Sequence, residues 1–121
     1  MPNVILKKFL EVEYRGVEYK VRIPKSYKDF KRISRNFFTL VNVANSDESD
    51  AAKQEQIDAI TDEQYKLLAP LCYDFSNVVD DENNQITSIQ GIADIDETLA
   101  HGLAANAGAE IVREANDIKK N

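Results

Sequence analysis

The sequence predicts a single α+β domain that is mostly helical, with an N-terminal β-hairpin followed by three to five α-helices. Three observations favour this fold class: apolar residues alternate with polar ones before residue 24, they recur every three or four positions after it, and helix-capping residues separate the periodic segments. The chain has 121 residues, 43% hydrophobic and 30% charged, which is typical of one domain. We therefore predict one domain over 1–121, with a hairpin region at 1–24 and a helical region at 25–121. Acidic loops are expected at 42–52 and 80–85.

The hairpin is predicted by the strict alternation of apolar and polar residues from Leu10 to Ile23. A two-residue loop at Arg15-Gly16 sets Val12 opposite Tyr19 and puts every apolar residue of both strands on one face. Gly16 supplies the positive φ that such a tight turn requires. A two-stranded hairpin is marginal in water, so helices or another strand must cover its apolar face, and Val4-Ile5-Leu6 is the candidate strand.

The first predicted helix begins at Tyr27, because Ser26 and Asp29 form a capping pattern just after Pro24 ends the second strand. Its apolar residues recur at three and four positions as far as Val41. The opposite face is basic and carries Lys28, Lys31, Arg32 and Arg35. A solvated surface is the simplest role for such a charged face.

The middle of the chain carries two helix-start signals and one helix breaker. A short helix is expected over 51–60, and a capping box at Thr61 predicts a new helix start there. Apolar residues then recur at helical spacing across Pro70 to Val79, so the proline either kinks this helix or restarts it. We interpret the aromatic residues of this stretch as core. Residues 86–91 form either a short strand or an extended connector.

A last helix begins after the capping pattern of Asp94 and Glu97 and is rich in small residues, which permit close approach of another backbone. Gly102 and Gly108 weaken a helix by ~1 kcal/mol each. The helix therefore either breaks near Gly108 or needs a partner to stay formed. We expect this helix to bind the partner, together with two cations of the basic helix. The predicted partner-binding residues are Leu103, Ala105, Ala109, Ile111, Val112, Lys28 and Arg32.

Residues for catalysis or metal binding occur in no recognisable pattern. The sequence has no nucleophile elbow, phosphate loop or dinucleotide motif. His101 is the only histidine and has no second ligand at metal spacing, and Cys72 is the only cysteine, in an apolar setting typical of a buried thiol. The acidic turn that begins at Asp80 lacks the glycine and the final glutamate of a calcium loop. We expect a non-enzymatic protein with no cofactor, no metal site and no small-molecule substrate.

Charge is distributed unevenly along the chain, whose net charge is -6. Residues 1–41 hold ten Lys or Arg against four Asp or Glu, whereas residues 42–121 hold five against seventeen. The basic and acidic parts either pack together within one fold or form a docking face for a partner. No apolar run approaches the roughly eighteen residues of a membrane span, and the N-terminus does not resemble a signal peptide. We expect cytoplasmic residence.

The hairpin carries a Tyr-x-Gly-x-x-Tyr-x-Val pattern from Tyr14 to Val21 and is followed by a helix and an acidic helical remainder. This order of parts resembles the small tail assembly chaperones of long-tailed bacteriophages. The resemblance implies a cytoplasmic assembly protein that coats the helical tape-measure protein before the tail tube polymerises, in the host cytoplasm if the chain is viral. It transfers no individual site residue.

Our leading hypothesis is thus an assembly protein that binds a helical protein partner or another copy of itself, with no membrane partner. One alternative is an acidic inhibitor that imitates the phosphate charge of nucleic acid. Its surrogate phosphates are Asp80, Asp81, Glu82, Asp94, Asp96 and Glu97. Another alternative is nucleic-acid binding through the basic helix 27–41, which the net negative charge disfavours.

Overall fold

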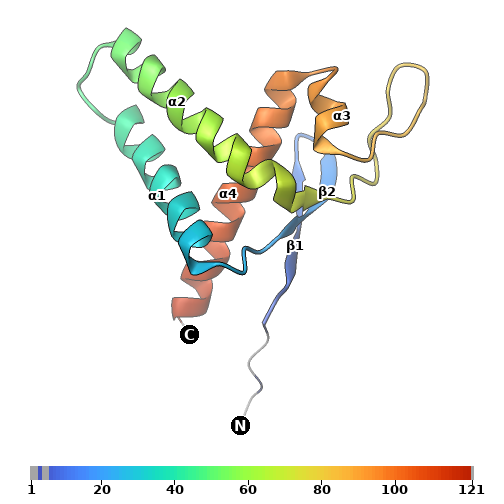
Figure 1. Cartoon of the computed structure of the whole chain (residues 1–121), viewed down its shortest axis with the longest axis horizontal. Coiled ribbons are helices and arrows are strands. Elements are labelled where there is room, and N and C mark those ends of the chain that lie inside the picture. The colour runs from blue at the N-terminus through green and yellow to red at the C-terminus, as the bar shows by residue number, and fades with distance from the viewer. Residues whose placement is uncertain (1–2, 4–5, 121) are drawn as a thin grey trace.

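The computed structural model describes residues 3 and 6–120, with side chains as far as residue 115. These residues form a three-stranded antiparallel sheet and four α-helices, which confirms the predicted fold class (Figure 1). The order along the chain is β1 (Phe9–Tyr14), β2 (Val17–Arg22), α1 (Tyr27–Ala44), α2 (Asp50–Leu68), the 3-10 turn η1 (Ala69–Leu71), β3 (Cys72–Tyr73), α3 (Ile89–Ala93) and α4 (Glu97–Lys120).

The hairpin has the predicted register. Val12 lies opposite Tyr19, and Tyr14 lies opposite Val17. Arg15 and Gly16 both have positive φ, 50° and 83°, as the favoured two-residue hairpin turn requires. The third strand is β3, which pairs with β2. The strand expected at residues 4–6 falls partly on Val4 and Ile5, which lie outside the described residues, and Leu6 is exposed and outside any strand.

Helix α1 begins at Tyr27 as predicted, and the Asp29 N–H donates to Ser26 Oγ over 3.4 Å. The prediction of two helices between residues 51 and 79 is wrong. Helix α2 is continuous from Asp50, with Ser49 as its N-cap, through the expected restart at Thr61. Residues 51–60 are mostly good helix formers, so once Ser49 has started the helix nothing before Thr61 ends it.

Pro70 ends helix α2 rather than kinking or restarting it. It lies in η1, and the chain then turns at Asp74, whose φ is 58°. Phe75 is nevertheless buried, as interpreted, at 1% exposure, whereas Val79 is 53% exposed. The apolar spacing that predicted helix on both sides of Pro70 therefore belongs, after Pro70, to non-helical chain.

The last third of the chain also differs in detail. Residues 86–91, predicted as either a short strand or an extended connector, form no strand. Ser88 caps the short helix α3 by accepting the Gly91 N–H over 3.0 Å. Helix α4 is capped by Asp96, which accepts the Leu99 N–H over 3.1 Å. It continues through Gly108 without a break.

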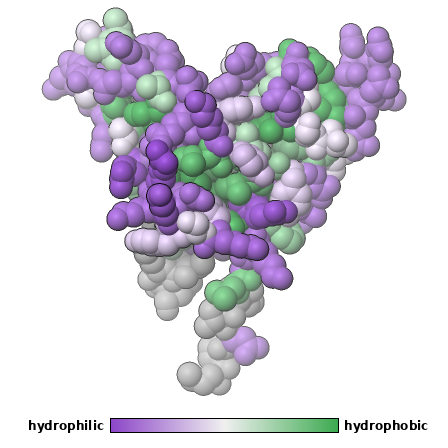
Figure 2. All heavy atoms as spheres, viewed as in Figure 1, coloured by the Kyte–Doolittle hydropathy of each residue, from purple (hydrophilic) through white to green (hydrophobic). Residues whose placement is uncertain are grey.

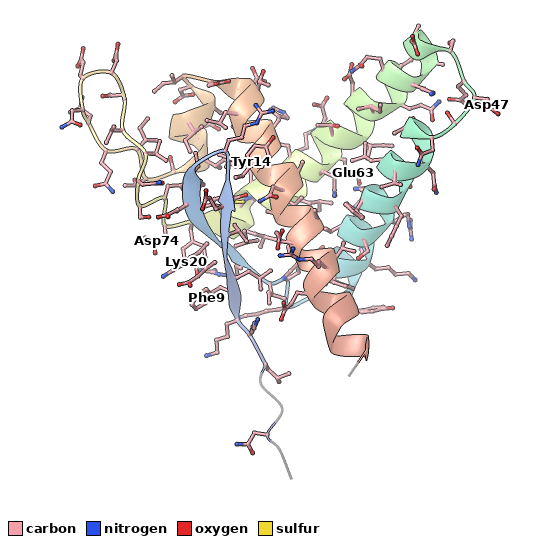
Figure 3. All side chains as sticks on the ribbon, turned by 180° about the vertical axis from the view of Figure 1, so that it is seen from behind. Phe9, Tyr14, Lys20, Asp47, Glu63 and Asp74 are labelled. Carbon is pink, nitrogen blue, oxygen red and sulfur yellow. The ribbon has the colours of Figure 1, made fainter. Side chains whose placement is uncertain are left out.

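The core lies where α4 packs between the sheet and the α1–α2 pair. Views from opposite sides both place α4 between the β-hairpin and these two helices (Figures 1 and 3). The Tyr19 hydroxyl donates to the Leu103 carbonyl over 2.7 Å, which ties β2 to α4. Tyr19 also stacks on Phe75 with ring centroids 5.2 Å apart. The largest fully buried side chains are Phe75, Ile33, Leu68, Leu103, Ile111 and Val21.

Candidate functional site

Two hollows lie along the contact between α1 and α4, and we call them together the α1–α4 groove. The first has a volume of about 160 Å³ and is lined by Phe37, Leu40, Val41, Thr61, Gln64, Tyr65, His101 and Ala105. The second has a volume of about 200 Å³ and is lined by Tyr27, Phe30, Lys31, Ser34, Phe38, Val112 and Ala115. Both linings are mostly apolar, as are the grooves that bind amphipathic helices.

The first hollow exists because the helices diverge from a close crossing. A Cβ built on Gly108 would lie 2.9 Å from Leu68 Cδ1 and 3.2 Å from Gln64 Nε2, so α2 and α4 are in near contact at this glycine. Beyond the crossing, the α1–α2 pair leans away from the first half of α4 (Figure 1). The surface is hollowed between the α1–α2 pair and the first half of α4, and hydrophobic residues gather at the base of the hollow (Figure 2).

The wall of the first hollow is held by a buried polar network. Gln64 is 3% exposed and accepts a hydrogen bond from Asn36 Nδ2 over 3.1 Å, while its own Nε2 donates to the Ile33 carbonyl over 3.3 Å. Every buried side-chain polar atom among the described residues has a partner. Such satisfied networks fix the geometry of the helices that they join. The α1–α2 wall of the groove is therefore preorganised.

An aromatic pair forms the α2–α4 side of the same hollow. Tyr65 stacks on His101 with ring centroids 4.3 Å apart and an interplanar angle of 18°. His101 Nδ1 donates to the Glu97 carbonyl over 2.9 Å, which orients the imidazole. Burial, followed by the nearby Glu97 carboxylate, raises the pKa of the Tyr65 hydroxyl. Tyr65 is therefore neutral at physiological pH and presents a flat, uncharged ring.

Helix α1 leaves an apolar stripe exposed beside the groove. Tyr27 is 75% exposed, Phe38 is 50% exposed and Val41 is 43% exposed. The helical period of 3.6 puts all three on one face, together with Ser34 between them. Large apolar side chains on one face are the usual mark of a surface that binds another protein.

Cations flank this stripe. Lys28, Lys31 and Arg35 are exposed on α1, and none of them forms an ion pair with the side chains that the structure describes. Arg32 differs, because its Nε lies 2.6 Å from Glu63 Oε1 on α2. The basic face therefore divides into one cation that joins α1 to α2 and three cations that are available to a partner.

The seven predicted partner-binding residues occupy different environments. Ala105 is exposed and lines the first hollow, and Ala109 is half-buried. Leu103, Ile111 and Val112 are buried. Leu103 and Ile111 line neither hollow and are occupied by packing within the chain, so the prediction that they bind a partner is corrected. Val112 lines the second hollow, so its role stays a prediction. Lys28 is exposed, whereas Arg32 is paired as described above.

Three of the six acidic residues proposed as phosphate mimics have roles in the local fold. Asp80 accepts the N–H groups of Asn84 and Glu82 over 2.8 Å and 2.9 Å, and the Asn84 bond is the main reason that the pKa of Asp80 is lowered. Asp94 accepts from Gln90, and Asp96 caps α4. These three carboxylates are engaged in local hydrogen bonds.

Cys72 is a packing residue. Its Sγ donates to the Leu68 carbonyl over 3.4 Å, and burial raises the pKa of the thiol to about 12. No group of three or more His, Cys, Asp or Glu side chains within residues 3 and 6–115 is arranged to hold a metal ion. None of the described helices is long and apolar enough to cross a membrane.

No protein-family model, curated protein or solved structure matches the chain.

The sequence interpretation missed most of the exposed stripe. It assigned Val41 to the core-facing side of the helix, and it did not single out Tyr27 or the Tyr65–His101 pair. A usable signal was present, because Phe37 and Phe38 are adjacent and so cannot both face one core. An apolar arc wider than one packed face predicts a second face that is left for a partner.

Proposed function

We propose that this chain is a non-enzymatic binding protein whose α1–α4 groove captures an amphipathic helix. The observation that carries the proposal is the stripe of Tyr27, Phe38 and Val41, which stays exposed beside two apolar hollows. Burying a side chain of this size stabilises a complex by about 1.5–3 kcal/mol. Helix-in-groove recognition uses apolar anchors three and four residues apart on the bound helix, and a continuous apolar stripe with two hollows offers such anchors a surface to pack on.

The cations beside the apolar stripe indicate what kind of helix the groove would bind. Lys28, Lys31 and Arg35 border the apolar stripe without partners among the described side chains. A bound helix is therefore expected to carry acidic residues beside its apolar anchors. Such pairing contributes mainly to orientation and association rate, while the apolar anchors supply most of the affinity.

The resemblance to tail assembly chaperones gives the proposal its specific form. In that form the captured helix belongs to a phage tape-measure protein, and the chain coats it in the host cytoplasm during tail assembly. A second copy of the chain is the other occupant that this function allows. Nucleic-acid binding by the basic helix is supported less, because Arg32 already pairs with Glu63 over 2.6 Å.

The test fills the first hollow. Ala105→Leu adds bulk at an exposed helical position that lines it, so binding of a fluorescent amphipathic peptide with leucines three and four apart should weaken at least about tenfold. Ala59→Leu is the matched control, since Ala59 is an exposed helical alanine that lines neither hollow. Equal affinity of both variants with an unchanged melting temperature contradicts the proposal.

Two further measurements separate the other functions. Light scattering detects self-association, and a rise in mass with concentration that Ala105→Leu abolishes identifies a second copy as the occupant. Lys28→Glu with Arg35→Glu leaves the Arg32–Glu63 ion pair in place, so it should abolish any nucleic-acid binding and lower the affinity for a captured helix only slightly. A salt titration supports this distinction, because counterion release makes nucleic-acid binding fall steeply with salt.

A further inference from the structure

The outer edge of β1 has backbone groups that face away from β2. The Ile23 N–H donates to the Lys8 carbonyl over 3.1 Å, so the pair just beyond the hairpin is hydrogen-bonded. Bonded and non-bonded pairs alternate in an antiparallel ladder. The register of the hairpin therefore directs the N–H and C=O groups of Phe9, Glu11 and Glu13 outward.

Neighbouring contacts agree with this alternation. The partner of Glu13 across the ladder is Glu18, whose N–H and C=O point the other way, toward Asn77 Oδ1 at 2.9 Å and the Ser76 N–H at 3.4 Å. No described residue hydrogen-bonds the outward groups of β1. The sheet therefore ends at β1 with an edge that accepts another strand.

Space for a strand exists beside this edge. A cleft of about 480 Å³ lies between β1 and the second half of α4, and its lining includes Phe9, Glu11, Glu110, Arg113 and Glu114. Phe9 and Tyr14 mark the two ends of the strand in Figure 3. Tyr14 packs closely against α4 at Gly102, so the cleft opens toward Phe9.

The charges along the edge identify the occupant. Glu11, Glu13 and Glu18 are exposed on one face of the hairpin, and none pairs with a described cation. In the cleft, Glu114 already pairs with Lys7 over 3.1 Å and Glu110 pairs with Arg113. Lys20 lies opposite Glu11 in the ladder, but its ammonium pairs with Asp74 over 3.0 Å. Glu11 and Glu13 therefore leave the outer strand with a net negative charge.

Self-pairing is disfavoured by the same charges. Two copies of β1 in antiparallel contact place Glu11 opposite Glu11 or Glu13 of the other copy in the registers with the greatest overlap. Like charges directly opposite each other destabilise a strand pair. The edge therefore selects against a second copy and in favour of a cationic strand.

We propose that the free edge of β1 binds an extended basic peptide by strand addition, with Lys or Arg opposite Glu11 and Glu13 and apolar side chains beside Leu10 and Val12, which also line the cleft. Main-chain hydrogen bonds to the three outward residues supply affinity, and alternate side chains supply specificity. This surface is independent of the α1–α4 groove, so its test does not depend on helix capture.

The probe is a short capped peptide of alternating lysine and valine, titrated into the isotope-labelled full chain. The amide signals of Phe9, Glu11 and Glu13 should shift, and their exchange with solvent should slow by about tenfold or more. A matched peptide with glutamate in place of lysine should not bind. Shifts confined to the α1–α4 groove, or equal binding of the acidic peptide, overturn the proposal.

Two variants of Glu11 separate the contribution of its backbone N–H to peptide affinity from that of its charge. Glu11→Pro removes an outward N–H at an edge position, where proline is tolerated, and should lower peptide affinity about tenfold or more. Glu11→Gln keeps that N–H and removes only the charge. Its peptide affinity should therefore fall less than that of Glu11→Pro, and the difference from the unmodified chain should disappear at high salt. Equal affinity of the proline variant and the unmodified chain refutes strand addition.

A modified peptide keeps the test valid if the proline variant fails to fold. Methylating alternate backbone nitrogens of the lysine–valine peptide removes its donors without changing its charge, so it should not bind the unmodified chain. Binding at unchanged affinity overturns the proposal. A concentration-dependent rise in the mass of the unmodified chain that Glu11→Pro abolishes also overturns it, because the edge would then be occupied by a second copy.

Discussion

Replacing Gly108 by alanine tests how closely α2 and α4 approach at the root of the groove. Alanine in a helix interior is favoured over glycine by ~1 kcal/mol. Against this, the new Cβ would lie 2.9 Å from Leu68 Cδ1 and 3.2 Å from Gln64 Nε2. Leu68 is fully buried and Gln64 is held by two hydrogen bonds, so neither side chain moves away freely.

Overpacking of this kind costs about 1–3 kcal/mol. After the gain in helix propensity is subtracted, Gly108→Ala should destabilise the fold by about 1 kcal/mol, which lowers the Tm of a domain of this size by about 4 °C. Thermal unfolding followed by circular dichroism measures the change. Chemical denaturation gives the free energy of unfolding independently.

Gly102→Ala in the same helix is the control. Its Cβ would lie 2.8 Å from the hydroxyl and 2.9 Å from Cε2 of Tyr14, so one half-buried ring at the end of the hairpin would have to shift. Because that ring can move, much of the gain in helix propensity should survive, and the Tm should stay level or rise. A rise in Tm for Gly108→Ala equal to that for Gly102→Ala would refute the close α2–α4 crossing.

Three other perturbations test the rest of the fold. Val12→Asp places a charge on the packed face of the hairpin opposite Tyr19 and should cost about 2 kcal/mol or more; an unchanged denaturation midpoint contradicts the register. Phe75→Ala removes a side chain that is 1% exposed and should cost about 3–5 kcal/mol. A cost below about 1 kcal/mol, measured by urea unfolding, would place Phe75 outside the core. The lowered pKa of Asp80 means that its turn stabilises the fold above the unfolded-state pKa of aspartate and loses this contribution as pH falls through the folded-state pKa. Asp80→Asn should therefore flatten the acid limb of the stability profile, and an unchanged limb would contradict the hydrogen-bonded turn.

The hairpin was predictable because its signals are local. Alternation of period two together with Gly16 leaves one register that buries every apolar residue. The start of α1 was predictable for the same reason, since Ser26 caps its own helix. Signals of this kind depend only on residues that are neighbours in sequence.

The course of the chain from Thr61 to Val79 was not predictable in this way. A capping box at Thr61 lies inside a helix that Ser49 had already started, and a start signal does not end an existing helix. Beyond Pro70, Cys72 and Phe75 are buried at helical spacing although the chain there is strand and turn. Periodicity records which residues are buried, and over a few residues it does not record the backbone that buries them.

The candidate site was predictable only in part because sequence does not reveal which helix is central. Helix α4 has packed neighbours on two sides, so Leu103 and Ile111 are used within the chain. Helix α1 lies at the outside of the fold, so part of its wide apolar arc, including Phe38, is not covered by other elements of the chain. The same amphipathic pattern is core on one helix and free surface on another.

The position of α4 also separates the two proposed surfaces. At 3.6 residues per turn, Ala105 and Val112 lie on one face of α4, and Glu110 and Glu114 lie on the opposite face. The first pair lines the α1–α4 groove, and the second pair lines the cleft beside β1. A captured helix and an added strand would therefore contact opposite sides of the same helix without colliding. The groove and the cleft share no lining residue. An experiment that contradicts one of the two proposals therefore leaves the other unaffected.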